Sequence, residues 1–117
     1  MLNRRCAPSC EGGIPAISKS QAIKYLKNLK GWRLSGNVKS IYAEYLMKNF
    51  IAAITLIQKI AGLAEKEGHH PDIHLTGYRK LRIELSTHAI GNLSENDFIL
   101  AAKIDALPKN LKKAAIS

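Results

Sequence analysis

Apolar residues recur at helical spacing in three separate stretches of the chain, and residues that favour helix ends flank these stretches. The first stretch covers residues 19–29. The second follows Asn49, a good N-cap, and runs to Gly68, which readily takes the left-handed conformation that ends helices. The third follows Ser94 and stops before Pro108. The pattern predicts three helices, and we expect the second to supply most of the core contact. The apolar residues of that second helix are Phe50, Ile51, Ile54, Ile57, Ile60, Ala61 and Ala64.

Shorter stretches between these helices are rich in strand-forming residues. Residues 32–34 and 38–46 lie on either side of a Gly-Asn turn, which predicts a hairpin. A second pair follows the long helix, with an extended segment at 73–76 and an alternating stretch at 79–87. Because apolar and polar residues alternate in the last stretch, one face of that strand is expected to contact the core.

The predicted elements follow the order α-β-β-α-β-β-α, which indicates the α+β class. A single four-stranded antiparallel sheet with three helices packed on one face is the simplest arrangement. The chain of 117 residues is long enough for one such domain, which we assign to residues 18–117. Residues 1–17 contain glycine and proline without periodicity and predict an N-terminal arm. Residues 109–117 are expected to extend the last helix or to fray.

The charge of the chain bears on its possible partners. Lysine and arginine number 18 against nine aspartates and glutamates, a net charge of +9 that attracts anions. The lysines are scattered without a block of five like charges, so we do not expect a nucleic-acid partner. No apolar run approaches the ~18 residues that span a membrane, and the basic N-terminus lacks the apolar segment of a secretory signal. We expect a cytoplasmic protein with no membrane contact. The alternative of a short organellar targeting segment at the N-terminus stays open.

The two cysteines, Cys6 and Cys10, lie close together in the predicted arm. In a chain without a secretory signal, two cysteines indicate a reducing compartment rather than a disulfide framework. Their spacing would supply half of a zinc site, but no further ligands lie nearby in the sequence. We therefore expect free thiols.

The densest cluster of titratable residues lies at positions 65–74. It holds three of the four histidines and three of the nine acidic residues. Glu65 lies four residues before His69, so the two side chains are expected to touch on one face of the helix. Pro71 biases His70 toward an extended backbone, so the two imidazoles should point in different directions. Two imidazoles placed differently around one pocket can divide the roles of acid and base.

Two residues from elsewhere in the chain are candidates for the same site. His88 ends the alternating strand and reaches the pocket if residues 73–88 form a hairpin. Asp97, at the start of the last helix, is a candidate carboxylate for orienting an imidazole.

Two other interpretations of the histidines stay open. One is a surface loop without a special role, since clustered titratable groups are only a probabilistic sign of function. The other is a metal site, with His69, His70, His74 and His88 as candidate ligands. We do not expect a metal, because consecutive histidines rarely chelate one ion. The His70-x-x-x-His74 spacing also requires a helix, which Gly68 and Pro71 prevent.

Together these residues resemble the pterin-4a-carbinolamine dehydratase family, and its plant and microbial members in particular. The shared spacing is an acid, three residues, His-His-Pro, six residues, an aromatic residue, nine residues, a histidine, eight residues and an aspartate. In this chain the positions are Glu65, His69, His70, Pro71, Tyr78, His88 and Asp97. We expect Tyr78 to be a core residue without substrate contact.

The resemblance implies an enzyme, a hydro-lyase without a cofactor. Its substrate would be a 4a-hydroxytetrahydropterin such as 4a-hydroxytetrahydrobiopterin, dehydrated to a quinonoid dihydropterin in tetrahydrobiopterin recycling. The implied mechanism is general acid and base catalysis by histidine. By position, the catalytic residues would be His69, His70 and His88. The substrate-binding residues would be Glu65, Pro71, Thr87 and Asp97.

The resemblance also bears on assembly and on an alternative function. Members of the family usually form homodimers or homotetramers, and we expect the same here. The alternative is a non-catalytic binding module, like a transcriptional coactivator or an assembly factor. The presence of all three histidines together with their acidic partners favours the enzyme.

Overall fold

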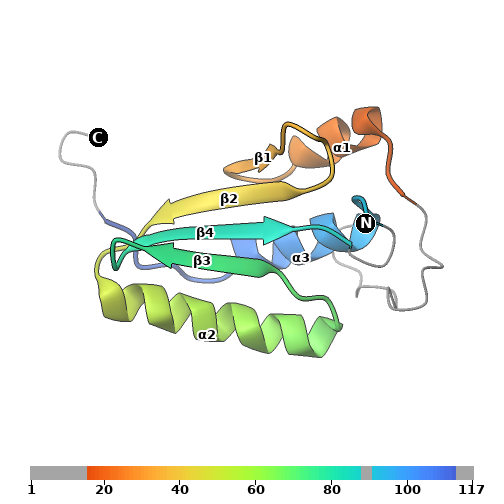
Figure 1. Ribbon diagram of the computed structural model, residues 1–117. Helices are drawn as coiled ribbons and strands as arrows, with labels where there is room; N and C mark the ends of the chain where they lie inside the picture. Colours follow the sequence, from red (N-terminus) through yellow and green to blue (C-terminus); the bar gives the residue numbers. More distant parts are fainter. Residues whose placement is uncertain (1–15, 88–90, 113–117) are drawn as a thin grey trace.

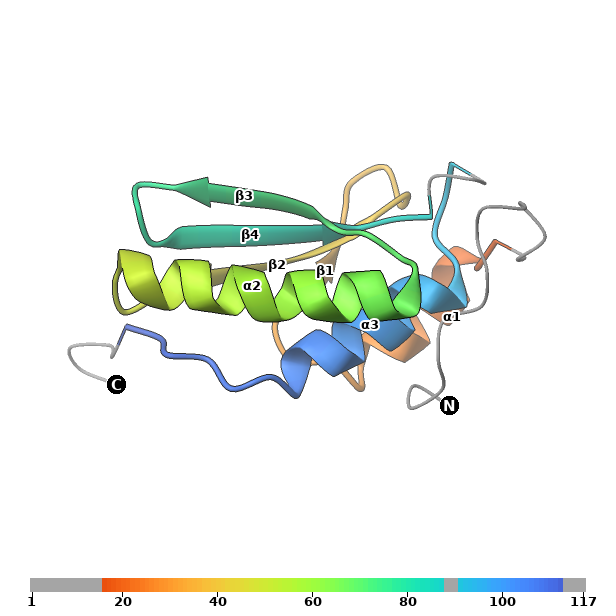
Figure 2. The ribbon, with the colours of Figure 1, turned by 90° about the horizontal axis from the view of Figure 1, so that it is seen from below.

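The computed structural model describes residues 16–87 and 91–112, in which helices and strands follow the predicted order (Figure 1). The elements are α1 (Lys19–Leu26), β1 (Trp32–Leu34), β2 (Ile41–Leu46), α2 (Phe50–Glu67), β3 (Asp72–Thr76), β4 (Lys80–Leu85) and α3 (Glu95–Asp105). The four strands form one sheet in the order β1-β2-β4-β3, and every neighbouring pair is antiparallel. Figure 2 shows that the three helices cover one face of this sheet. The predicted α+β architecture is therefore confirmed.

Alternation along β4 separates the core from the outer face of the sheet. Leu81, Ile83 and Leu85 are buried, as their spacing predicts. On the outer face, Arg82 Nε donates to Glu84 Oε1 at 3.0 Å. Since a slip of one residue would move the apolar side chains into water, this alternation fixes the strand register.

The buried face of α2 differs from the predicted one. Phe50 and Ile51, in its first turn, are 49% and 70% exposed. These two side chains are therefore not core residues, whereas Ile60 and Ala64 are buried as predicted. The buried apolar residues of α2 are Ala52, Ala53, Leu56, Ile60 and Ala64.

The hairpin between β1 and β2 has a longer loop than predicted, since β2 begins at Ile41 rather than at residue 38. Asn37 Oδ1 accepts hydrogen bonds from Ser35 Oγ at 2.6 Å and from the Lys39 N–H at 3.0 Å. Ser35 N–H also donates to the Ser40 carbonyl at 2.9 Å. Local side-chain hydrogen bonds of this kind compete with strand pairing and favour a turn.

Tyr78 is not a core residue, contrary to the prediction. It lies in the turn between β3 and β4 with φ +55°, and its side chain is 56% exposed. Gly77, with φ +53°, precedes it. The two consecutive left-handed residues reverse the chain tightly, and the turn directs the ring into solvent.

The C-terminal segment after α3 neither extends the helix nor frays within the described residues. Leu111 forms an antiparallel bridge with Met47, and the Lys112 N–H donates to the Leu46 carbonyl at 2.9 Å. Lys109 Nζ donates to the Ile104 carbonyl at 2.7 Å near the end of α3. Burial lowers the pKa of Lys109. The segment thus ties the end of α3 to the end of β2.

Gly68 ends α2 in the left-handed conformation, with φ +66°, as predicted. Gly68→Ala is expected to lower the free energy of unfolding by about 1 kcal/mol, because an L-residue is strained there. Gly62 lies inside the same helix with open space around its Cα. Gly62→Ala, the matched control, should raise the free energy of unfolding by about 0.5–1 kcal/mol. Urea unfolding measures both, and equal effects of the two substitutions would contradict the prediction.

Candidate active site

The candidate site residues lie where the end of α2, the end of β4 and the start of α3 meet (Figure 1). Gly68 turns the chain out of α2 and leaves His69 and His70 ahead of β3. Thr87 follows β4, and Asp97 lies in the first turn of α3. Segments far apart in the sequence therefore come together at one end of the domain.

A buried pair of His69 and Asp97 forms the centre of this region. His69 Nε2 lies 2.6 Å from Asp97 Oδ1, and the two side chains are 5% and 0% exposed. A carboxylate accepts hydrogen bonds, so Nε2 is the donor and Nδ1 is left for other chemistry. The predicted role of Asp97 as a carboxylate next to an imidazole agrees with this contact.

Glu65 contacts His70 rather than His69, contrary to the prediction. Its Oε2 is hydrogen-bonded to His70 Nε2. The expected contact assumed that the helix runs to Gly68, but α2 ends at Glu67 and Gly68 takes the left-handed conformation. His69 turns toward α3 instead, and His70 is left 63% exposed beside the 77% exposed Glu65. The two imidazoles thus occupy different environments, as Pro71 led us to expect.

Asp97 also receives two hydrogen bonds on its second oxygen. Thr87 Oγ1 donates to Oδ2 at 3.0 Å, and the Ser94 N–H donates to the same atom at 2.9 Å. Thr87 and Ser94 are fully buried, and their hydroxyl oxygens lie 2.6 Å apart. The sequence predicts Ser94 as a helix cap, and the structure adds this contact with Thr87. The Ser-x-x-Asp spacing of this cap was the signal in the sequence that could have placed Ser94 next to Asp97. Asp97 is both the acidic residue of the cap and the partner of His69.

His88, the third predicted catalytic histidine, lies outside the described residues. The residues on either side of it are tied together, since the Thr87 N–H donates to the Asn92 carbonyl at 2.9 Å. Among the described residues, the structure therefore brings together His69, Thr87 and Asp97 in one network. His70 and Glu65 form a separate pair, and the half-buried Pro71 follows them.

His74, named above as a metal candidate, belongs to another surface. It lies on β3, and its Nε2 is 3.5 Å from Glu84 Oε1 of β4. Within residues 16–87 and 91–112, no group of three or more histidine, cysteine, aspartate or glutamate residues is arranged to hold a metal ion. Cys6 and Cys10 lie outside these ranges. None of the helices in the same ranges has the length and apolar composition needed to cross a membrane.

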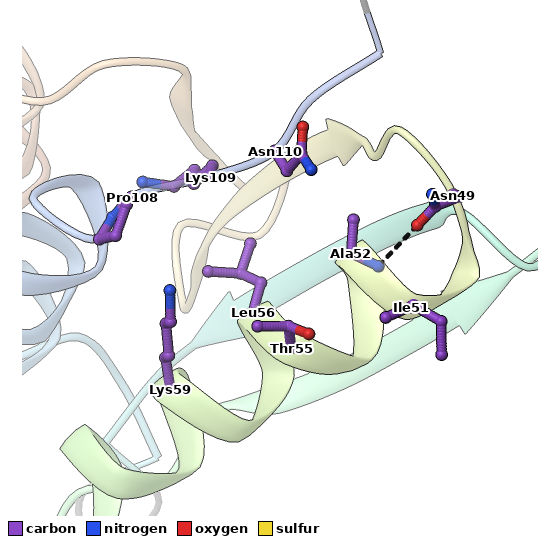
Figure 3. A pocket seen from close by; sticks show the side chains of 9 residues that line it. All are labelled: Asn49, Ile51, Ala52, Thr55, Leu56, Lys59, Pro108, Lys109 and Asn110. Atoms are coloured by element: carbon purple, nitrogen blue, oxygen red, sulfur yellow. Dashed lines mark hydrogen bonds between the residues drawn. The ribbon is translucent and has the colours of Figure 1, made fainter.

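A groove of about 450 Å³ lies between the first half of α2 and the segment that follows α3 (Figure 3). Ile51, Ala52 and Leu56 line one side, and Pro108 and Asn110 line the other. Since α2 has 18 residues and is about 27 Å long, its first half and its C-terminal end are separate surfaces. None of the residues that line the groove is a candidate site residue.

The fold and the site together define an α+β domain with acid and base side chains gathered at one end of its sheet. Residues 15–107 match the family model described as pterin 4 alpha carbinolamine dehydratase. The chain belongs to this family, as the resemblance in its sequence indicated.

Individual relatives agree with this assignment. The chain is 44% identical to a putative pterin-4-alpha-carbinolamine dehydratase of Nitrosomonas eutropha, over 92% of each protein. It is 40% identical to the mitochondrial pterin-4-alpha-carbinolamine dehydratase 2 of Arabidopsis thaliana, over 92% of this chain and 58% of the plant protein. A crystal structure of a transcriptional coactivator/pterin dehydratase from Brucella melitensis superposes with a TM-score of 0.74 at 27% identity. That match covers 79% of this chain and 97% of the other.

Proposed function

We propose that this chain removes water from a 4a-hydroxytetrahydropterin, such as 4a-hydroxytetrahydrobiopterin, to give the quinonoid dihydropterin. Membership in the family supports a hydro-lyase. The observation that carries the proposal is the pairing of each described histidine of the His-His-Pro motif with its own carboxylate: His69 with Asp97 and His70 with Glu65. A carboxylate next to an imidazole fixes the position of its proton, which is what acid and base catalysis requires.

The reaction needs two proton transfers and no redox step. The bond from the 4a carbon to the hydroxyl oxygen breaks, and a general acid protonates the departing hydroxyl to water. A general base removes the proton from the adjacent ring nitrogen, and the nitrogen lone pair forms the new carbon–nitrogen double bond. We assign these transfers to His69, His70 and His88, without a cofactor or metal.

The remaining residues would act around these histidines. Glu65 would orient His70, and Asp97 would orient His69 through the Nε2 contact. Pro71 and Thr87 would belong to the segments that line the pterin. We further propose that the protein works in the cytoplasm in tetrahydrobiopterin recycling, as a homodimer or homotetramer.

The first test is dehydration of freshly generated 4a-hydroxytetrahydropterin, followed by absorbance with and without the purified chain. We expect the chain to accelerate dehydration, and we expect the acceleration to survive a chelator. A folded sample that gave no acceleration would reject the proposed activity. A rate that the chelator abolished would reject the metal-free mechanism.

A non-catalytic binding module is the second candidate function. The relative from Brucella is described as a transcriptional coactivator as well as a pterin dehydratase, and the exposed Phe50 and Ile51 would suit a protein contact. The dehydration assay distinguishes the two functions, because a binding module does not need to accelerate the reaction.

A further inference from the structure

Two buried hydroxyl groups, those of Thr87 and Ser94, are linked to the pair of His69 and Asp97 through the second carboxylate oxygen of Asp97. Both residues are fully buried, and their hydroxyls are hydrogen-bonded to each other, to Asp97 and to the Asn96 N–H. Buried polar groups that are fully paired can rigidify a site.

The hydrogen bonds fix the direction in which each hydroxyl donates. Thr87 has one proton, and its Oγ1 donates to Asp97 Oδ2 at 3.0 Å. The 2.6 Å contact between Thr87 Oγ1 and Ser94 Oγ must therefore be donated by Ser94. The other contact of Ser94 Oγ uses a lone pair, since it accepts the Asn96 N–H at 3.3 Å. The hydroxyl proton of Ser94 is therefore available for donation to Thr87. The protons thus point in one direction, from Ser94 through Thr87 to Asp97.

This directed chain determines which atoms are left for the imidazole. Oδ2 of Asp97 accepts from Thr87 Oγ1 and from the Ser94 N–H, so Oδ1 is the oxygen that faces His69. His69 must then donate from Nε2, and Nδ1 is the nitrogen that can exchange a proton with a substrate. A rotation of the carboxylate would break three hydrogen bonds at once.

We propose that Thr87 and Ser94 are positioning residues for His69, acting through Asp97. The inference rests on the proposed dehydratase function. It assigns a role to Ser94 beyond capping α3, and it places the action of Thr87 in its hydroxyl rather than in a contact with the pterin. The two hydroxyls also join the end of β4 to the start of α3. Asp97, the partner of the His69 imidazole, is therefore held by two rigid elements.

The kinetic test compares a graded series of variants. Thr87→Val removes the donor to Asp97 and is expected to lower kcat about tenfold, with KM within about twofold. Thr87→Ser keeps the hydroxyl and should restore the wild-type kcat. Ser94→Ala leaves the donor of Thr87 in place, so its loss should fall between the two. Ser18→Ala, which removes the corresponding cap of α1, is the matched control and should leave kcat unchanged.

A spectroscopic test needs no activity. A buried imidazole proton donated to a carboxylate at 2.6 Å should give a far-downfield ¹H resonance, which His69→Gln would identify by its loss. We expect this resonance to move or disappear in Thr87→Val and to persist in Thr87→Ser and Ser18→Ala. If Thr87→Val does not fold, Ser94→Ala provides the same comparison.

The possible outcomes separate this inference from the proposed function. An unchanged resonance and an unchanged kcat in Thr87→Val would overturn the positioning role. A loss of kcat equal in Thr87→Val and Thr87→Ser would also overturn it, because the hydroxyl would then not matter. If the wild-type protein showed no dehydration but the resonance still depended on the Thr87 hydroxyl, the positioning inference would stand and the proposed function would fail.

Discussion

His70→Ala is expected to lower kcat/KM for pterin dehydration by about 10²–10⁴-fold, the usual effect of removing a general acid or base. The fold should be unaffected, because the side chain is 63% exposed and its described partner, Glu65, is exposed as well. Substitutions at such positions usually change the free energy of unfolding by less than about 0.5 kcal/mol. The loss of kcat/KM would therefore come from the missing acid or base and not from unfolding. Steady-state kinetics and urea unfolding on the same preparation measure the two effects separately.

His74→Ala is the matched control for this prediction. His74 is also an exposed histidine next to a glutamate, but it lies on β3 and contacts Glu84 of β4. Its removal changes the charge and the histidine content in the same way, so kcat/KM should stay at the wild-type value. Wild-type turnover by His70→Ala would show that the role assigned to His70 is wrong. An equal loss in both variants would point to a general effect of charge.

The fold was predictable because local and long-range patterns agree. Asn49 and Gly68 mark the ends of α2 through side-chain and backbone chemistry that needs no tertiary information. The alternation of Leu81, Ile83 and Leu85 fixes the buried face of β4 in the same way. When propensity, capping and periodicity indicate the same element, that element is predicted well.

The errors arose where packing rather than sequence decides which side chain is buried. Phe50 and Ile51 are as hydrophobic as core residues, yet the orientation of α2 leaves both exposed. Tyr78 was expected in the core, but two successive left-handed residues place it in a turn. Hydrophobicity gives the tendency of a side chain to be buried, and the helix and turn geometries set its direction.

For the buried pair of His69 and Asp97, the sequence indicated the two residues but not their contacts. The spacing that includes His69 and Asp97 identified both members of the buried pair. It could not show which carboxylate meets which imidazole, because one left-handed residue, Gly68, reverses the choice. The contact between Thr87 and Ser94 joins one residue that follows β4 and one that precedes α3, so neither residue lies inside an element whose periodicity could relate them.

Asp97→Asn is expected to lower kcat by about 10³–10⁴-fold while the domain still folds, since an imidazole in the wrong tautomer costs about 10⁴-fold in serine proteases. Two donors, Thr87 Oγ1 and the Ser94 N–H, converge on Oδ2, so the amide oxygen of asparagine must take that place. The amide nitrogen then faces His69 Nε2 and donates to it. The imidazole proton moves to Nδ1, which can no longer accept a proton from the substrate.

Asp97→Ala separates this electronic effect from a structural one. It leaves the Thr87 hydroxyl, the Ser94 N–H and His69 Nε2 buried without their acceptor, so the free energy of unfolding should fall by about 3 kcal/mol or more. The asparagine variant should lose much less stability in urea unfolding. Nitrogen NMR of the His69 ring reports the tautomer directly. If the proton had moved to Nδ1 in Asp97→Asn and kcat stayed at the wild-type value, His69 Nδ1 would not be the atom that exchanges protons with the pterin.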